Sequence, residues 1–445
     1  MTPLRRVVST RLRTGPVVRV IQPLRDFLAT EAASGVLLIV AAVAAMVWAN
    51  SPWKGSYESL WSSEISFRVA GHSLSLDLRH WVNDGLMTLF FFVVGLEIKR
   101  EVSVGELKDP RRAALPAIAA LGGMVVPALV FVAVNLGGTG VRGWGIPMAT
   151  DIAMAVGVLA LIGSHVHPSL KLFLLALAIV DDIGAIVVIA VFYSKGIDVT
   201  MLLVSVALIV AVVAAKMLGV SSVGVYVVLG ALLWFSVHEA GVHATIAGVI
   251  LGLLAPTNAI VEAHQVDEAA LADVSSYSAA SETVRMARQS VSVVEWLEHR
   301  LHPWTSYVIV PLFAFANAGI SINSSAVKAA VSSRITLGVI LGLVIGKTVG
   351  VTVASWVAVR TRVASLPDGL TWGSVVGVAL LAGIGFTVSL FVAGLAYDDA
   401  ALDAQAKLGI LVATVIAGLL GTLALRFGSR PAQDAVLESE QHVDL

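Results

Sequence analysis

The 445-residue chain contains no cysteine, and this absence removes several kinds of chemistry at once. Without a thiol the protein has no disulfide, no thiolate metal ligand and no cysteine nucleophile. Charged residues are also scarce, at 13% of the chain, which is about half the share of an average soluble domain. The net charge of −1 favours neither nucleic acid nor an acidic partner. The composition therefore excludes an ordinary soluble domain, while the redox compartment stays open.

Long apolar runs take the place of the missing charge. Hydrophobic residues make up 57% of the chain, and many runs approach the ~20 residues that cross a bilayer. We therefore predict an all-α polytopic membrane protein with about twelve transmembrane helices. The predicted spans are 33–49, 81–98, 113–135, 144–163, 169–193, 199–217, 221–237, 241–255, 304–322, 335–359, 371–396 and 406–426.

The basic residues set the orientation of these spans. With both termini on one side, 20 lysines and arginines fall on that side and 8 on the other. The positive-inside rule then places both termini in the cytoplasm. The arginine-rich start has no apolar stretch behind it until Ala33, so it indicates a tail and not a signal peptide. We divide the chain into an N-terminal tail 1–32, a transmembrane domain 33–428 and a disordered C-terminal tail 429–445.

Two connections between the predicted spans have a pattern of their own. Apolar and polar residues alternate on both sides of a turn at 70–73, which predicts an extracytoplasmic β-hairpin over residues 64–78. A hairpin of two strands has unpaired edges, so it is a candidate contact in a homodimer, or else a cover over the helices. Residues 257–300 form a long cytoplasmic connection, acidic at first and helical in its second half.

Two adjacent acids, Asp181 and Asp182, lie in the middle of the apolar run between Lys171 and Lys195. One carboxylate at the centre of a bilayer costs roughly 2.5–3.5 kcal/mol on insertion scales, and two neighbours also repel each other. Acids at this depth usually belong to an ion or proton path. Lys347 is a third charged residue at membrane depth. It lies at the centre of its span, where its side chain cannot reach water by extending along the helix. We expect it to face a carboxylate or a wet cavity.

Two predicted spans are interrupted, one in each half of the chain. Gly143, Gly145 and Pro147 predict a break just before Asp151, and Gly383–Thr387 interrupts the eleventh span similarly. A broken span in each half points to a transport site at mid-membrane. The half-helix ends carry about half a charge each, which Asp151 and Lys347 could balance. Flexible kinks with one buried polar residue are the simpler alternative.

Several of these segments together resemble the NhaA family of sodium/proton antiporters, from about residue 30 to 428. The segments that carry the resemblance are Phe90–Glu101, Ala149–Ala153, Val180–Ile186, Gly241–Thr245, Phe313–Gly319 and Gly346–Lys347. Departures are the longer acidic connection before the ninth span and the longer tails.

The resemblance implies a multi-pass protein of the bacterial inner membrane with two discontinuous helices crossing at mid-membrane in inverted repeats, for which this family is a standard example. It implies sodium at Asp181 and Asp182, with Asp182 the more central. Asp151 and Lys347 lie at the crossing of the broken helices. It also implies sodium, lithium and protons as substrates, with no cofactor and no catalytic residue.

We expect sodium and protons to compete for one carboxylate site, because sodium is a hard cation that takes oxygen ligands. Thr150 and freed backbone carbonyls join the two acids as ligands. The resemblance favours more protons than sodium per cycle, with the second proton on Asp181 or Lys347. Residues that match the family's pH-response positions are Glu97, Glu101, Glu298, His302 and His243.

Other interpretations stay open at this point. Glu97 and Glu101 also fit a helix-end cluster that only anchors the span, and His243 is equally consistent with a structural residue. A proton-coupled carrier for another cation or an organic anion is the nearest alternative function. An intramembrane aspartyl protease is less consistent, because Asp151 and Asp182 lack its flanking motifs. The pair His238 and His243 lies five residues apart, about 140° around a helix, which does not fit a zinc protease.

Overall fold

The computed structural model describes residues 32–69, 72–162, 167–194, 196–220, 222–257, 292–321, 328, 330, 332–367 and 369–428. Apart from Ala32, the predicted N-terminal tail lies outside these residues. The predicted C-terminal tail 429–445 and residues 258–291 of the long connection lie outside them as well.

Six helical segments of the described residues are long and apolar enough to cross a membrane by themselves. Two of them contain a short π-helical segment: α4–η2–α5 (Leu78–His80, Trp81–Leu86, Met87–Ser103) and α17–η8–α18 (Arg334–Ile340, Leu341–Gly346, Lys347–Arg360). The other four are α6 (Pro110–Asn135), α8 (Pro168–Phe192), α9 (Val199–Met217) and α21 (Ala400–Gly428).

Three further helix pairs pass the same test together but are bent at a break. They are α2 (Ala32–Ala49) with α3 (Lys54–Trp61), bent by 116°; η4 (Thr139–Met148) with α7 (Ile152–Ile162), bent by 47°; and α19 (Trp372–Ala382) with α20 (Phe386–Ala396), bent by 44°. The last two breaks lie where the sequence predicted them. Counting each pair as one span raises the number of candidate spans in the described residues from 6 to 9.

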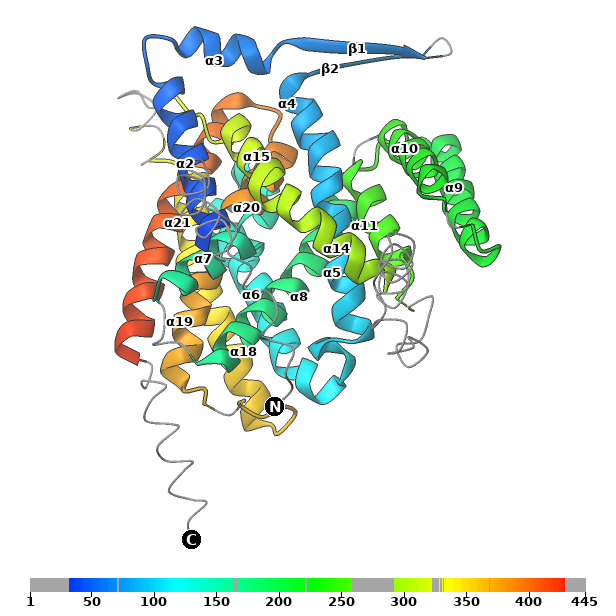
Figure 1. The fold of residues 1–445 in the computed structure, drawn as a ribbon. Helices are drawn as coiled ribbons and strands as arrows, with labels where there is room; N and C mark the ends of the chain where they lie inside the picture. Colours follow the sequence, from blue (N-terminus) through cyan, green and yellow to red (C-terminus); the bar gives the residue numbers. More distant parts are fainter. Residues whose placement is uncertain are drawn as a thin grey trace, which may run out of the picture.

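Shorter helices complete the described part of the fold: η3 (Glu106–Lys108), α10 (Val223–Glu239), α11 (Thr245–Leu254), α14 (Val293–Trp304), η7 (Thr305–Ile309) and α15 (Val310–Asn317). In Figure 1, α9 and α10 lie together at one edge of the molecule, away from α7, α19 and α20. Helix begins at Val293, within the connection 257–300 whose second half was predicted to be helical, and continues through η7 and α15 to Asn317, inside the predicted ninth span 304–322. Ser292 caps its first turn by accepting a hydrogen bond from the Glu295 N–H.

Polar residues of the usual capping types begin several of the spans. Asp109 starts α6 by accepting from the Arg111 N–H, and Asp198 starts α9 by accepting from two backbone N–H groups. Ser333 and Thr371 do the same for α17 and α19. A helix leaves its first N–H groups without intrahelical partners, so each of these side chains fixes where a span begins.

Glycines on one face of α17–η8–α18 allow α6 to pack unusually close. A Cβ atom added at Gly350 would lie 2.2 Å from the Gly122 carbonyl oxygen, a separation that real Cβ atoms do not show. Gly346 approaches Pro127 in the same way, at 2.8 Å. This close approach brings the centre of the helix, with Lys347, against α6.

The predicted hairpin is present as a two-stranded antiparallel sheet of β1 (Glu64–Val69) and β2 (His72–Asp77). Val69 pairs with His72, so the second strand begins two residues earlier than predicted. It also ends earlier, because Leu78 begins α4, which Asp77 caps by accepting from the His80 N–H at 2.7 Å. In Figure 1 the sheet extends sideways from the same end of the molecule as α3.

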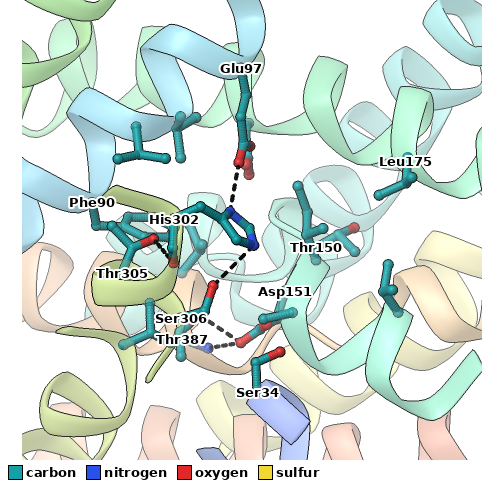
Figure 2. A pocket seen from close by; sticks show the side chains of 18 of the residues that line it. Ser34, Phe90, Glu97, Thr150, Asp151, Leu175, His302, Thr305, Ser306 and Thr387 are labelled. Atoms are coloured by element: carbon teal, nitrogen blue, oxygen red, sulfur yellow. Dashed lines mark hydrogen bonds and ion pairs between the residues drawn. The ribbon is translucent and has the colours of Figure 1, made fainter. Parts of the chain in front are cut away.

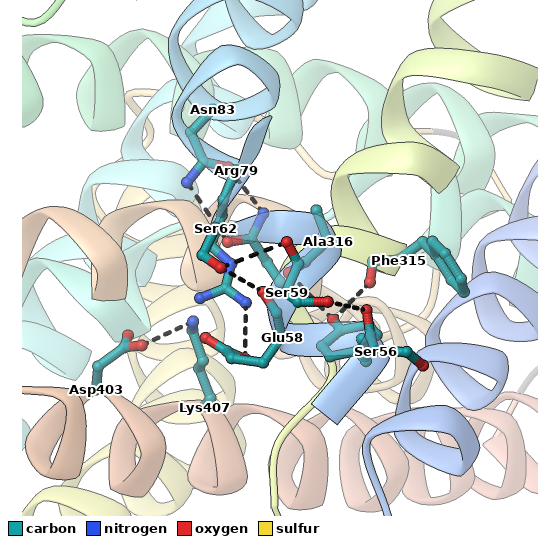
Figure 3. A network of polar contacts seen from close by, with 12 residues as sticks. Ser56, Glu58, Ser59, Ser62, Arg79, Asn83, Phe315, Ala316, Asp403 and Lys407 are labelled. Carbon is teal, nitrogen blue, oxygen red and sulfur yellow. Dashed lines mark hydrogen bonds and ion pairs between the residues drawn. The ribbon is translucent and has the colours of Figure 1, made fainter. Parts of the chain in front are cut away.

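A polar network joins the elements at this end of the molecule (Figure 3). Arg79 of α4 lies 3.3 Å from Glu58 of α3, and the Asn317 amide at the end of α15 donates to Asn83 at 2.8 Å. Tyr57 of α3 is buried and donates to the Phe315 carbonyl oxygen at 2.8 Å. These contacts hold α3 across the ends of the neighbouring helices.

Candidate functional site

The two broken helices meet at their breaks. η4 ends at Met148 and α7 begins at Ile152, while α19 ends at Ala382 and α20 begins at Phe386. The Asp151 N–H donates to the Ile384 carbonyl oxygen at 2.6 Å, so one extended residue at the first break bonds directly to the second break. Four half-helix ends with their unsatisfied backbone groups therefore come together inside the protein.

The Asp151 carboxylate caps two of these ends. Its Oδ1 accepts from the Met154 N–H of α7 at 2.9 Å. Its Oδ2 accepts from the Thr387 N–H of α20 at 3.0 Å and from the Thr387 hydroxyl at 2.6 Å. Both helices present the positive end of their dipole to this carboxylate. Asp151 therefore lies between the N-terminal ends of α7 and α20.

Thr150, the neighbouring residue, connects the break to the acid pair on α8. Its Oγ1 lies 2.7 Å from Asp181 Oδ2 and 2.9 Å from the Ala382 carbonyl oxygen at the end of α19. It also accepts from Lys347 Nζ at 3.1 Å. A hydroxyl carries one proton, so it donates to Asp181 or to the carbonyl but not to both at once.

Lys347 and Asp181 form an ion pair with both side chains fully buried. Lys347 Nζ donates to Asp181 Oδ2, while Asp181 Oδ1 is buried with no hydrogen-bond partner among the described residues. Two opposite charges in a medium that excludes water depend strongly on each other, because removing one leaves the other uncompensated. The carboxylate partner that the sequence predicts for Lys347 is therefore Asp181.

Asp182 has a different environment from Asp181. It forms no hydrogen bond with another described residue, and it lines a cavity of about 350 Å³. Asp151 and Thr150 also line this cavity, as do Glu97 and His302, whose ring lies between Glu97 and Ser306 in Figure 2. The complete lining is Ser34, Phe90, Val93, Val94, Glu97, Thr150, Asp151, Ile152, Ala153, Val156, Lys171, Leu175, Asp182, His302, Thr305, Ser306, Tyr307, Val310, Thr387 and Val388.

The cavity thus offers carboxylate and hydroxyl oxygens to a cation at one end. No three Asp, Glu or His side chains lie close enough to hold a resident metal ion in the part of the chain that the structure describes. Among the lining residues, the acids Asp151 and Asp182 and the hydroxyl groups of Thr150 and Thr387 carry side-chain oxygen atoms. Oxygen groups of this kind suit a hard cation.

Four of the predicted pH-response residues lie close together, and two of them, Glu97 and His302, line the cavity. His302 Nδ1 lies 3.5 Å from Glu97 Oε1 (Figure 2). Arg100 joins the other two acids, bonding to Glu298 and lying 3.0 Å from Glu101 Oε1. The four candidates are therefore parts of one charge cluster.

The two residues of this cluster on α14, which precedes the predicted ninth span, have shifted pKa values. The hydrogen bond to Glu97 raises the pKa of His302 above that of an ordinary histidine. Burial raises the pKa of Glu298, against the opposing effect of Arg100. Both groups therefore hold a proton to a higher pH than they would in water.

His243, the fifth candidate, lies apart from this cluster. Its Nε2 is 3.6 Å from Asp84 Oδ1, and its Nδ1 is 2.9 Å from the Thr245 hydroxyl. The ring packs edge-on against Phe391 of α20, with centroids 4.9 Å apart. His243 is not among the cavity-lining residues.

The sequence did not identify three side chains that fix the site. Thr387 binds Asp151, although only the break around it was visible as a glycine-rich interruption. Tyr193 and Tyr397 bind the backbone of η4 from the ends of α8 and α20. An aromatic residue at the end of an apolar span is common at membrane interfaces, so these two tyrosines carry no distinct signal in the sequence.

Comparison with known proteins gives one family match and many close relatives. Residues 25–425 match the family described as Na+/H+ antiporter 1. The Na(+)/H(+) antiporter NhaA 2 of Myxococcus xanthus is 46% identical, with 95% of this chain and 94% of the relative covered. The Na(+)/H(+) antiporter NhaA 3 of Frankia alni is 44% identical, with 95% and 93% covered. The Na(+)/H(+) antiporter NhaA of Oleidesulfovibrio alaskensis is 43% identical, with 92% and 95% covered.

Proposed function

The chain belongs to the Na+/H+ antiporter 1 family, the NhaA antiporters, and on this premise we propose that it extrudes cytoplasmic sodium in exchange for external protons. The family consists of secondary transporters, and the apolar helices support a multi-pass protein of a bacterial membrane. Membership of this family therefore favours sodium/proton exchange over the two alternatives, an intramembrane protease and a carrier for another substrate.

The environment of Asp182 is the observation that carries the mechanism. This carboxylate faces the cavity without a hydrogen-bond partner among the described residues, whereas Asp151 accepts three hydrogen bonds and Asp181 is paired with Lys347. Asp182 is therefore the acid whose charge is least compensated by the protein. We infer that a proton and a sodium ion compensate it in turn, which makes the two substrates compete.

Proton release from everted membrane vesicles tests this proposal. Added sodium should discharge the proton gradient, lithium should act similarly, and potassium should not. Asp182→Asn should abolish the exchange. The matched control is Asp198→Asn at the start of α9, because asparagine is as good a helix cap as aspartate. Exchange at the wild-type rate in Asp182→Asn vesicles would refute the assignment.

We propose that a second proton takes part in each cycle, which makes the exchange electrogenic. When a cation approaches Asp181, it competes with Lys347 for the same carboxylate. We propose that the second proton is carried by Asp181 or by Lys347, whose pairing the cation disrupts. Two protons for one sodium move one net charge per cycle, so the membrane potential contributes about 2.3 kcal/mol per 100 mV. Current on a supported membrane should follow sodium addition, and exchange without current would support a ratio of one to one.

We propose twelve spans with both termini in the cytoplasm, the two broken spans crossing at mid-membrane. The absence of cysteine makes this easy to test, because single cysteines can be introduced without a background. A membrane-impermeant thiol reagent should label Ser75→Cys in the hairpin from outside, and Lys108→Cys in η3 only in everted vesicles. The reverse labelling would invert the proposed orientation.

The response to pH has two possible origins. Competition at Asp182 alone predicts that the apparent sodium affinity rises with pH while the maximal rate stays nearly constant. A separate sensor in the cluster of Glu97, Glu101, Glu298 and His302 predicts a rate that collapses at acid pH even in saturating sodium. We propose that competition is the dominant effect. Rates at saturating sodium between pH 6 and 9 decide the question, and a collapse at acid pH would overturn the proposal.

The sheet of β1 and β2 is a candidate contact between two copies of the chain. It has only two strands, so each strand has one edge without a partner in the described residues. A third or fourth strand from a second copy would satisfy these backbone groups. The Leu78 N–H bonds to the Ser63 carbonyl oxygen at 3.0 Å, so residues 64–76 can be replaced by a short linker that keeps the Asp77 cap. The shortened protein should become monomeric in detergent and keep its exchange activity; a persistent dimer would refute the contact.

A further inference from the structure

The outer half of the first broken helix, η4, has an irregular backbone. Its residues Thr139–Met148 form two short 3-10 helical stretches on either side of a kink at Gly143, whose φ of −77° and ψ of 15° are non-helical. Runs of this helix longer than three or four residues are uncommon, because its hydrogen bonds have poor geometry. A segment of this kind inside a membrane protein needs contacts from outside itself to keep one position.

Tyr193, at the end of α8, supplies one such contact. Its hydroxyl donates to the Arg142 carbonyl oxygen at 2.9 Å and accepts from the Gly145 N–H at 3.2 Å. Residues 142 and 145 are an i, i+3 pair, which a 3-10 helix joins by its own hydrogen bond. The tyrosine hydroxyl therefore bridges one turn of the irregular helix beside its non-helical residue.

The other contacts come from α20 and its end. The Tyr397 hydroxyl donates to the Gly140 carbonyl oxygen at 2.6 Å, and the Ser389 hydroxyl donates to the Ile146 carbonyl oxygen at 2.7 Å. Thr387 of the same helix binds Asp151. As α20 advances from 387 to 397, its partners run back from 151 to 140. The two segments are thus antiparallel and joined at three points.

Glycine is needed where the two tyrosines reach η4. A Cβ atom at Gly143 would lie 2.1 Å from the Tyr397 hydroxyl oxygen. A Cβ atom at Gly145 would lie 2.8 Å from the Tyr193 hydroxyl oxygen. The glycines that predict a break in the sequence therefore also make room for the two hydroxyl groups.

We propose that Tyr193 and Tyr397 are positioning residues that set the geometry of the sodium site through η4. Both side chains are buried, and η4 ends two residues before Thr150, which bonds to Asp181. Tyr193 follows the acid pair on the same helix by eleven residues, about 16 Å at 1.5 Å per residue. One helix thus holds the acids and the half-helix that presents Thr150 to them. The inference rests on the proposed exchange function.

The test is the apparent sodium KM of Tyr193→Phe and Tyr397→Phe in everted vesicles. Phenylalanine keeps the ring and removes only the hydroxyl, so we expect the variants to accumulate normally. If η4 keeps its position in only a tenth to a third of the molecules, the KM rises by the inverse, about three- to tenfold. The maximal rate per protein should change much less, whereas a purely structural defect would lower the amount of protein and not the affinity.

Tyr226→Phe is the matched control. The Tyr226 hydroxyl also donates to a backbone carbonyl oxygen, that of Val220, at 2.9 Å, but at the start of α10. Its loss should leave the sodium KM unchanged. Ser389→Ala, which removes the neighbouring contact from α20, should raise the KM as the tyrosine variants do and replaces any of them that fails to accumulate.

Each outcome has a distinct meaning. Wild-type vesicles without sodium-dependent proton release would refute the proposed function itself. Wild-type exchange with an unchanged KM in the tyrosine or Ser389→Ala variants would refute only the positioning role. An equal rise in the Tyr226→Phe control would also refute it, because loss of any tyrosine hydroxyl bonded to the backbone would then have the same effect.

Discussion

Replacing Asp151 by asparagine should lower the stability of the protein more than replacing Asp182. The Asp151 carboxylate accepts from two backbone N–H groups and one hydroxyl at the starts of α7 and α20. An asparagine side chain has only one oxygen, so it can accept from one helix while its NH2 group faces the donors of the other. The change also removes the negative charge between two positive helix ends.

The size of the effect follows from these contacts. A nearby anion stabilises a helix N-terminus by about 0.3–2 kcal/mol. A buried donor left without an acceptor costs about 1–3 kcal/mol. Loss of the charge at two helix ends, together with one unsatisfied N–H of Thr387, therefore amounts to about 2–7 kcal/mol. Asp182 makes no hydrogen bond with a described residue, so its replacement should leave stability unchanged or raise it.

Thermal unfolding of the purified variants in detergent measures this difference. We expect a melting temperature several degrees below wild type for Asp151→Asn and an unchanged or higher one for Asp182→Asn. Exchange in vesicles should show the opposite order, with Asp182→Asn inactive and Asp151→Asn retaining some activity where it folds. Equal melting temperatures for the two variants would refute the capping role of Asp151.

Three further expectations follow from particular contacts. The raised pKa of His302 means that its charged pairing with Glu97 stabilises the protein fully below the ordinary histidine pKa and is lost as pH rises through the raised value. His302→Gln should therefore lower the melting temperature at acid pH more than at alkaline pH, and an equal change at both would exclude the charged pairing. Lys347→Gln and Asp181→Asn should each lower the melting temperature strongly, because each leaves a buried charge unpaired at a cost of about 3–5 kcal/mol. The double variant should recover part of the loss, and strictly additive losses would exclude the pairing. Gly350→Ala should destabilise the packing of α18 on α6. Gly394→Ala, with no atom within 4 Å of the added Cβ, should be neutral or stabilising. Equal effects of the two variants on thermal unfolding would contradict the close approach of α18 to α6.

The sequence predicted the charged members of the site because each is conspicuous by itself. A carboxylate or an ammonium group in an apolar span needs no knowledge of its neighbours to be recognised, as with Asp181, Asp182 and Lys347. The break before Asp151 was equally visible, because glycine and proline interrupt the helical pattern locally. The helical segment Arg334–Arg360 begins and ends within one residue of the predicted span 335–359, and helix from Val293 agrees with the helical second half predicted for the connection 257–300.

The partners within the site were not predictable, because they are set by which helices lie side by side. Lys347 contacts Asp181 across a separation of 166 residues, and Thr387 contacts Asp151 across 236. A threonine or a tyrosine in a membrane span is ordinary, so neither Thr387 nor Tyr397 stood out. Such contacts depend on which helices pack against each other. The residue pattern of one helix shows only which of its own faces is apolar, and not which helix packs against that face.

The contrast between Asp181 and Asp182 follows from the helix on which they lie. Neighbouring residues of an α-helix point about 100° apart, so two adjacent acids on α8 cannot face the same partners. Asp181 points at Lys347 and Thr150, and Asp182 points into the cavity. One charge is therefore held by the protein while the other is available to a substrate, yet they are close enough to repel. A cation or a proton at Asp182 relieves this repulsion, and its departure restores it, so the paired acid raises the affinity of its neighbour for either substrate. Asp181→Asn should accordingly weaken sodium binding even where Asp182 is intact, and an unchanged sodium KM in that variant would show that the two carboxylates act independently.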